Sequence, residues 1–239
     1  MTGHAIILAA GQGVRLRAIV EDRPKGLIEI GGETLVGRSI RLLRAAGVRR
    51  ITIVAGYLAE QYARLAVQDA EISVATNGAF ATTGSMASLA AALFVTPAED
   101  VLVLESDIIY DTRALPSILP ILDATLVSGP TDAGDEVWVD AIDDRLRAMS
   151  KDRRQVSSVI GEFVGITHLS RAAADAMRAE FGAFVAAHGH GRMDYETGAL
   201  VKVARRVPIR TVLVPDLQWG EIDDERHYAR VTSMDWSER

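Results

Sequence analysis

The sequence predicts an α/β fold in which a mixed, mostly parallel sheet carries helices on both faces and has a small antiparallel subregion. Short apolar runs alternate with segments of helical periodicity over about the first 130 residues, which is the pattern of a doubly wound sheet. After that point, two strand-like segments flank a tight polar turn, as in an antiparallel hairpin. No linker or repeat interrupts the 239 residues, so we expect a single domain (1–239) with two halves, about 1–130 and about 131–239.

The elements of the first half follow from local patterns. Residues 4–10 form an apolar run that ends in glycines, as expected of a buried parallel strand. Residues 34–46 have apolar side chains at helical spacing, and Gly47 ends that helix. The same criteria predict strands at 50–56, 71–75, 101–104 and 125–128, and helices at 58–66, 85–94 and 115–122.

The second half has a different pattern. Residues 136–141 and 145–150 are predicted to form the hairpin, with Asp143 and Asp144 in its turn. Ser170 is expected to cap a long alanine-rich helix over 170–187. Further strands are expected at 162–167 and 210–215, and a further helix at 193–205. This half is expected to form a lid on the same sheet.

Composition excludes several classes of site and partner. The chain has no cysteine, which excludes disulfides and zinc–thiolate sites. Its net charge of −6 argues against a nucleic-acid partner. No apolar stretch is long enough for a membrane span, and the first residues lack the features of a secretion signal, so we expect a cytoplasmic protein.

A glycine-containing loop follows the first strand, at residues 8–16 (LAAGQGVRL). Two glycines spaced by one residue are as compatible with a plain tight turn as with a phosphate loop, and Leu16 replaces the third glycine of a dinucleotide fingerprint. Two basic side chains follow, Arg15 and Lys25. Backbone N–H groups, a forked guanidinium and a compact ammonium are the donors that bind phosphates in proteins. The segment is therefore a candidate phosphate-binding loop.

A carboxylate lies at the end of the buried strand 101–104. Asp107 follows Glu105 and Ser106 there, and a charged group in that position is costly to desolvate without a partner. Oxygen ligands at a strand end can hold a hard cation beside phosphates. Asp107 is therefore a candidate metal ligand.

The loop LAAGQGVRL and the following RPKGLIEIGGETLV resemble the signature of the nucleotidylyltransferase superfamily, which includes sugar-1-phosphate nucleotidylyltransferases and phosphocholine cytidylyltransferases. Val14 stands where those proteins usually have Thr or Ser. The resemblance implies a Rossmann-like fold, a nucleotide-binding first half and an acceptor-binding second half. It also implies catalytic roles for Arg15 and Lys25 at the triphosphate, and Asp107 and Asp223 as ligands of Mg²⁺.

The resemblance also places the nucleotide. The loop before the helix 85–94 contains small and polar residues that let the backbone approach a flat base, although Ser85 alone could be a helix N-cap. The positions implied to bind the nucleotide are Leu8, Ala9, Ala10, Gly11, Gly13, Asn77, Thr83, Gly84 and Ser85.

The second half resembles cytidylyltransferases that act on phosphocholine or on phosphonates. Positions implied for acceptor binding are Trp138, Lys151, Arg192 and Asp194. A choline pocket needs an aromatic cage, but aromatic residues make up only 5% of the chain and Arg192 would repel a quaternary ammonium. We therefore expect CMP transfer from CTP to a small phosphonate with release of pyrophosphate, with phosphocholine as the next acceptor.

Three alternatives remain. A sugar-1-phosphate nucleotidylyltransferase using UTP, GTP or dTTP would run the same reaction type. A non-catalytic nucleotide-binding domain would not need two metal carboxylates. A dinucleotide oxidoreductase lacks support, because the third glycine and a strand-end acid for the ribose are missing.

Overall fold

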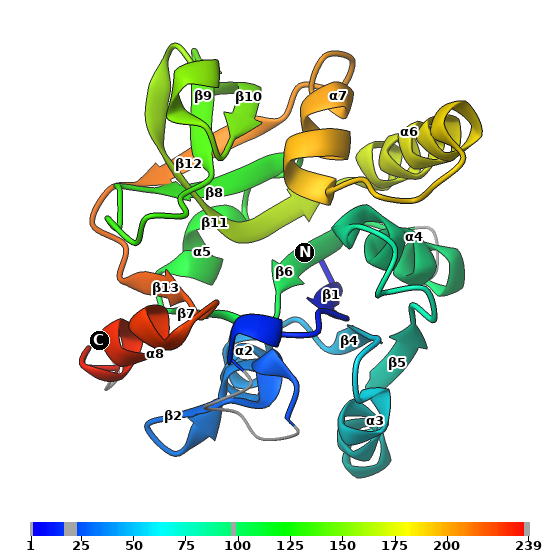
Figure 1. Ribbon diagram of the computed structural model, residues 1–239, viewed down its shortest axis with the longest axis vertical. Helices are drawn as coiled ribbons and strands as arrows, with labels where there is room; N and C mark the ends of the chain where they lie inside the picture. Colours follow the sequence, from blue (N-terminus) through cyan, green and yellow to red (C-terminus); the bar gives the residue numbers. More distant parts are fainter. Residues whose placement is uncertain (1, 17–22, 97–98, 237–239) are drawn as a thin grey trace.

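The computed structural model describes residues 2–16, 23–96 and 99–236 of the chain. Its main feature is a nine-stranded mixed sheet that draws strands from both halves of the sequence (Figure 1). The strands are β1 (His4–Ala9), β4 (Arg50–Ala55), β5 (Ile72–Thr76), β6 (Val101–Glu105), β8 (Ala124–Ser128), β9 (Trp138–Ile142), β10 (Arg145–Ser150), β11 (Val159–Leu169) and β12 (Arg210–Val214).

The spatial order of the sheet is β5-β4-β1-β6-β11-β8-β12-β10-β9. The first four strands are parallel, whereas β11 runs antiparallel to β6 and β8, and β9 and β10 form the expected antiparallel hairpin. All six residues of β1 are buried, as expected of a central parallel strand. The predicted α/β fold with a mixed sheet is confirmed.

Helices cover both faces of this sheet. One apolar core packs against α2, α3 and α5, and the other against α4, α6 and the segment that ends in α7. No helix in the described part of the chain is long and apolar enough to cross a membrane. The helices are α2 (Leu35–Ala45), α3 (Ala59–Gln68), α4 (Ser85–Val95), α5 (Ala114–Ile118), α6 (Arg171–His188), α7 (Val201–Val203) and α8 (Glu225–Thr232).

Helix ends follow the local chemistry of the sequence. The Thr34 hydroxyl accepts a hydrogen bond from Gly37 N at 3.0 Å and caps α2, and Gly47 follows the helix with a φ of 84°. Ser170 caps α6 in the same way, accepting from Ala173 N at 3.2 Å. The predicted helix 115–122 is shorter than expected, since α5 ends before Pro120, which cannot donate a helical hydrogen bond.

The predicted helix 193–205 is partly wrong. It is a π-helical turn, Tyr195–Leu200, that continues into the short α7. The preceding backbone is held by the start of α4: Met86 N donates to Met193 O at 3.0 Å, and Tyr195 N donates to Ser85 Oγ at 2.8 Å. These tertiary contacts hold the backbone before Tyr195, so no α-helix begins at Met193 as the periodicity predicted.

The C-terminal segment has structure that was not predicted. Strand β13 (Trp219–Glu221) pairs antiparallel with β7 (Ile108–Tyr110), and α8 follows it, capped by the Asp224 side chain. A small hairpin, β2 (Glu29–Ile30) and β3 (Glu33–Thr34), turns at two glycines of positive φ. Figure 1 shows α8, β13 and β7 together beside the N-terminal half.

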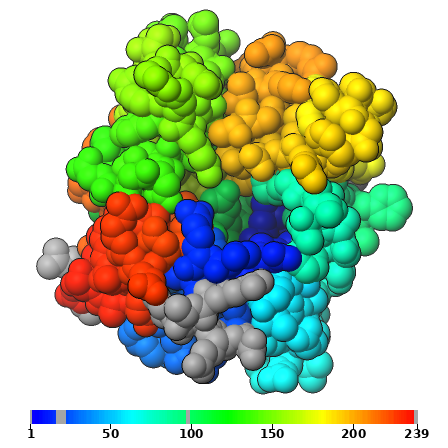
Figure 2. All heavy atoms as spheres, viewed as in Figure 1, coloured from blue at the N-terminus to red at the C-terminus, as the bar shows by residue number. Residues whose placement is uncertain are grey.

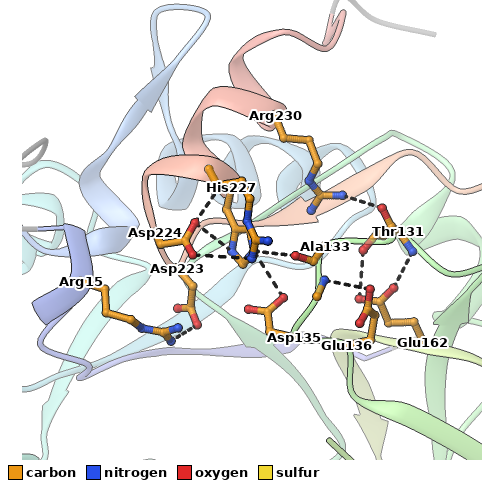
Figure 3. Close-up of polar contacts among 12 residues, drawn as sticks. Arg15, Thr131, Ala133, Asp135, Glu136, Glu162, Asp223, Asp224, His227 and Arg230 are labelled. Carbon is orange, nitrogen blue, oxygen red and sulfur yellow. Dashed lines mark hydrogen bonds and ion pairs between the residues drawn. The ribbon is translucent and has the colours of Figure 1, made fainter. Parts of the chain in front are cut away.

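Polar contacts fix α8 to the loop between β8 and β9 (Figure 3). His227 is 1% exposed and its Nε2 lies 3.4 Å from Ala133 O, and Arg230 donates to Thr131 O at 3.4 Å. Thr131 in turn donates from its backbone N to Glu162 of β11 at 2.8 Å. The end of the chain is thereby anchored to the central sheet.

Glu162 is expected to make stability depend on pH. Burial raises the pKa of this carboxyl to about 7, and the two Thr131 hydrogen bonds offset only part of that shift. Because the folded-state pKa exceeds the ordinary value of 4.5, folding binds a proton in this window. The associated stability is full below pH ~4.5 and is lost as the pH rises through about 7, a change on the order of 3 kcal/mol.

Glu162→Gln keeps an acceptor for Thr131 N and removes the titration. We expect the wild-type protein to lose stability relative to this variant between pH 5 and pH 8, measured by urea unfolding at constant ionic strength. Glu60→Gln on the exposed side of α3 is the matched control and should track the wild type. Parallel stability profiles for the wild type and Glu162→Gln would contradict this role for burial.

Candidate active site

A cavity of about 220 Å³ opens at the carboxyl ends of β1 and β6. The chain continues from β1 to β4 and β5 on one side, and returns to β6 on the other, so this is a switch point of the sheet, where ligands bind in open α/β folds. Figure 2 shows a hollow at the centre of one face. The lining residues are Leu8, Ala9, Ala10, Gly11, Lys25, Tyr62, Asn77, Phe80, Thr83, Gly84, Ser85, Ser88, Glu105, Ser106, Asp107 and Glu221.

The glycine loop forms one wall of the cavity. Gly13 has a φ of 57°, which disfavours other residues, and a Cβ there would lie 2.9 Å from Lys25 Cγ. The aliphatic stem of Lys25 therefore packs directly on the loop. This contact places the Lys25 ammonium beside the carboxyl ends of the strands.

Arg15, Lys25, Asp107 and Asp223 form one ion-pair network. Lys25 Nζ donates to Asp107 Oδ2 at 3.1 Å and to the Asp223 carboxylate, and Arg15 also donates to Asp223. Burial opposes the charge on Lys25, but the Asp107 and Asp223 carboxylates outweigh it and raise the pKa of Lys25 above its usual value. The four residues expected from the sequence to act together are therefore in contact.

Three carboxylates converge next to this network. One oxygen each from Asp107, Glu221 and Asp223 lies within 4.8 Å of the others. The pairing of β13 with β7 brings them together, and Ile222 N donates to Asp107 O at 2.9 Å. Burial and the two neighbouring aspartates raise the pKa of Glu221 well above its ordinary value.

The carboxylate cluster fits a hard divalent cation. Oxygen ligands in this number and arrangement suit Mg²⁺, which relieves the mutual repulsion of like charges. Asp107 and Asp223 were expected here, whereas Glu221 was not. Its position two residues before Asp223 in an extended segment was the available signal, because side chains at that spacing point to the same side.

The expected base-binding loop forms a second wall of the cavity. Asn77 Nδ2 donates to Thr83 Oγ1 and to Ser88 Oγ, each at 3.0 Å, so its amide shapes the loop. A Cβ on Gly84 would lie 2.4 Å from Met193 O, which requires glycine at that position. Ser85 is the first residue of α4. Its hydroxyl oxygen accepts a hydrogen bond from Tyr195 N and thereby links the two halves of the chain. Of the positions expected to bind the nucleotide, Gly13 is not among the lining residues, whereas the other eight line the cavity.

The residues expected to bind the acceptor lie at different positions relative to the cavity and its carboxylates. Lys151 is exposed at the end of β10, and its charge acts on Glu105, Glu196 and Asp223. Arg192 is exposed, donates from Nε to Thr82 O at 3.4 Å, and is not among the lining residues.

Two further acceptor candidates also lie away from the lining residues. The Trp138 ring lies 5.9 Å from the Arg153 guanidinium, and Asp194 is exposed. Lys151 is not among the lining residues either, but its positive charge acts on Asp223 of the carboxylate cluster.

Two buried residues of the site were not predicted from the sequence. Tyr62 of α3 is fully buried and lines the cavity, and a Cβ on Gly26 would lie 2.7 Å from its hydroxyl. Glu196, in the π-helical turn, is 7% exposed and accepts a hydrogen bond from Ser85 Oγ at 3.3 Å. Both lie in segments that were predicted only as helices, 58–66 and 193–205, and residue type alone did not single them out.

Several proteins of known activity are similar to this chain. A 2-aminoethylphosphonate cytidylyltransferase of Lancefieldella rimae is 32% identical over 106 residues, which are 44% of this chain and 43% of that protein. A choline-phosphate cytidylyltransferase of Streptococcus pneumoniae is 45% identical over 58 residues, 24% of this chain and 25% of that protein. A UTP–glucose-1-phosphate uridylyltransferase of Haloferax volcanii is 39% identical over 57 residues, 24% of each chain. These matches span less than half of each relative.

The fold is shared over almost the whole chain with solved structures. The inositol-1-phosphate CTP transferase from T. maritima superposes with a TM-score of 0.79 at 20% identity, covering 97% of this chain and 95% of that one. A family model described as the MobA-like NTP transferase domain matches residues 5–162, which is more than half of the chain. The matched range contains the glycine loop, Lys25 and Asp107. The chain therefore belongs to the MobA-like NTP transferase family.

Proposed function

We propose that the protein transfers CMP from CTP to a small phosphonate and releases pyrophosphate. The observation that carries this proposal is the meeting of two cations, Arg15 and Lys25, with three carboxylates beside a cavity at the sheet's switch point. Phosphoryl-group transfer depends mainly on positioning and on neutralising charge, and this arrangement offers groups for both.

Each charged residue has a role in this proposal. Asp107, Glu221 and Asp223 would hold Mg²⁺, which would supply positive charge to offset that of the phosphates. Lys25 and Arg15 bind phosphate oxygens of the nucleotide and stabilise the charge that develops during transfer.

The chemistry needs no general base. The acceptor is a phosphonate oxyanion, which attacks the α-phosphorus in line. A new P–O bond forms as the bond to the β-phosphate oxygen breaks, and pyrophosphate leaves with the electron pair. Lys151 is proposed to bind and orient the attacking phosphonate, because its charge acts on Asp223 of the carboxylate cluster.

The choice of CTP and a phosphonate is supported by the cavity and by the relatives. The wall made by Leu8–Gly11 and the 77–85 loop is compact and polar, which suits a pyrimidine. The matched proteins include cytidylyltransferases that are named for 2-aminoethylphosphonate and choline phosphate. A uridylyltransferase is also similar to the chain, which supports transfer to a sugar 1-phosphate as the alternative reaction. A non-catalytic role is disfavoured by the three converging carboxylates.

Nucleotide preference tests the proposal. Calorimetric titration in the presence of Mg²⁺ should rank CTP above ATP and GTP, because the proposed base pocket favours the smaller pyrimidine ring. Pyrophosphate release should be measured for CTP, UTP, GTP, ATP and dTTP with phosphonates, phosphocholine and sugar 1-phosphates as acceptors. Turnover with UTP or dTTP and a sugar 1-phosphate, but not with CTP and a phosphonate, would favour the sugar enzyme instead.

A further inference from the structure

Glu105 and Glu196 form a pair of carboxylates on the acceptor side of the cavity. Glu105 is the last residue of β6 and lines the cavity, whereas Glu196 comes from the π-helical turn of the second half. The two charges act on each other, and Ser85, another lining residue, donates to Glu196 at 3.3 Å. The pair therefore lies where the nucleotide half meets the acceptor half.

The Glu105 carboxylate has space but no partner. A Cβ on Gly165 of β11, whose φ is 88°, would lie 2.9 Å from Glu105 Oε2, so the glycine makes room for this group. No residue in the described part of the chain donates a hydrogen bond to Glu105 or forms an ion pair with it. Charging a carboxyl group that lacks a hydrogen-bond or ion-pair partner is costly in an enclosed site, and a cation bound beside it would offset that cost.

The cations of the ion-pair network are paired with other carboxylates. Lys25 and Arg15 are paired with Asp107 and Asp223, and the metal cluster consists of Asp107, Glu221 and Asp223 without Glu105. The cation that acts on both Glu105 and Glu196 is the exposed Lys151. A ligand with one positive group would therefore complement the pair.

We propose that Glu105, assisted by Glu196, binds the ammonium group of a zwitterionic aminoalkylphosphonate and thereby selects the acceptor. This inference rests on the proposed function and deepens it. The phosphonate would lie near Lys151 and the metal carboxylates, and its carbon chain would carry the ammonium towards Glu105. Selection would then come from the acidic pair, and a neutral or anionic group in place of the ammonium would lose this contact.

A comparison of two acceptors of nearly equal size tests the proposal. 2-Aminoethylphosphonate and 2-hydroxyethylphosphonate differ mainly in the charged group, and each is assayed for pyrophosphate release with CTP and Mg²⁺. The wild-type protein should prefer the amine, and Glu105→Gln should lower the ratio of the two kcat/KM values by roughly 10- to 150-fold, the range for a hydrogen bond to a charged group. Glu60→Gln, on exposed α3, should leave the ratio unchanged.

A second variant separates recognition from general damage. Glu196→Gln should also lower the amine-to-alcohol ratio, by a smaller factor, because Glu196 acts beside Glu105 and keeps its Ser85 contact. Equal losses for both acceptors in Glu105→Gln and Glu196→Gln, or a wild-type preference for the alcohol, would overturn the proposal. Turnover of the alcohol with CTP would still support the proposed function, whereas no turnover with any phosphonate would reject that function as well.

Discussion

Replacing Asp107 with asparagine is expected to lower the rate of CMP transfer by roughly 100- to 1,000-fold. Asparagine keeps the size of the side chain but loses the charge that the metal cluster needs. The Asp107 carboxylate pairs with Lys25 and also belongs to the cluster with Glu221 and Asp223, so its charge contributes to both interactions. Pyrophosphate release at saturating CTP and Mg²⁺ measures the loss.

The matched control is Asp175→Asn on α6, whose side chain is 53% exposed and pairs only with arginines of its own helix. It should keep wild-type activity. Circular dichroism and thermal unfolding of both variants would show that the fold is retained. An Asp107→Asn protein that releases pyrophosphate at close to the wild-type rate would contradict the assigned metal site.

Lys25→Met is expected to have an effect of similar size, roughly 100- to 1,000-fold on kcat/KM. Methionine keeps much of the stem that packs on Gly13 but removes the ammonium. The Lys25 side chain is 15% exposed and is the most buried cation of the ion-pair network, so water cannot replace its charge well. The loss should appear in transfer with every acceptor.

The variant should also depend more strongly on Mg²⁺ for stability. Without Lys25, the three carboxylates of the cluster face each other with Arg15 as the remaining cation of the described network. Added Mg²⁺ should therefore raise the Tm of Lys25→Met more than that of the wild type. Lys202→Met, an exposed site on α7, is the control. An equal rise in all three proteins would contradict the compensating role of Lys25, and no rise in any of them would argue that the cluster does not bind the metal.

The parts of the site that were predictable lie next to each other in sequence or at strand ends. An apolar run followed by a glycine loop predicts both the central strand and the wall of the cavity. A carboxylate directly after a buried strand, such as Asp107, is conspicuous because its burial is costly without a partner. Both features are local, and tertiary structure did not alter them.

The features that were missed depend on contacts between distant segments. Glu221 joins the cluster because β13 pairs with β7 more than 100 residues earlier in the chain. The π-helical turn follows backbone that the first turn of α4 holds through the hydrogen bond from Met86 N to Met193 O. The acceptor candidate Arg192 lies on this segment and is exposed outside the lining residues. Local periodicity and residue type contain no information on such pairings.

In the proposed reaction, CMP becomes bonded to a phosphonate oxygen. The most direct measurement is ³¹P NMR of a reaction containing the protein, CTP, Mg²⁺ and 2-aminoethylphosphonate. We expect a pair of coupled signals, one phosphate and one phosphonate, that grow together with free pyrophosphate and are absent with Asp107→Asn. Pyrophosphate with free CMP and unchanged phosphonate, or no reaction while a sugar 1-phosphate is consumed with UTP, would contradict it.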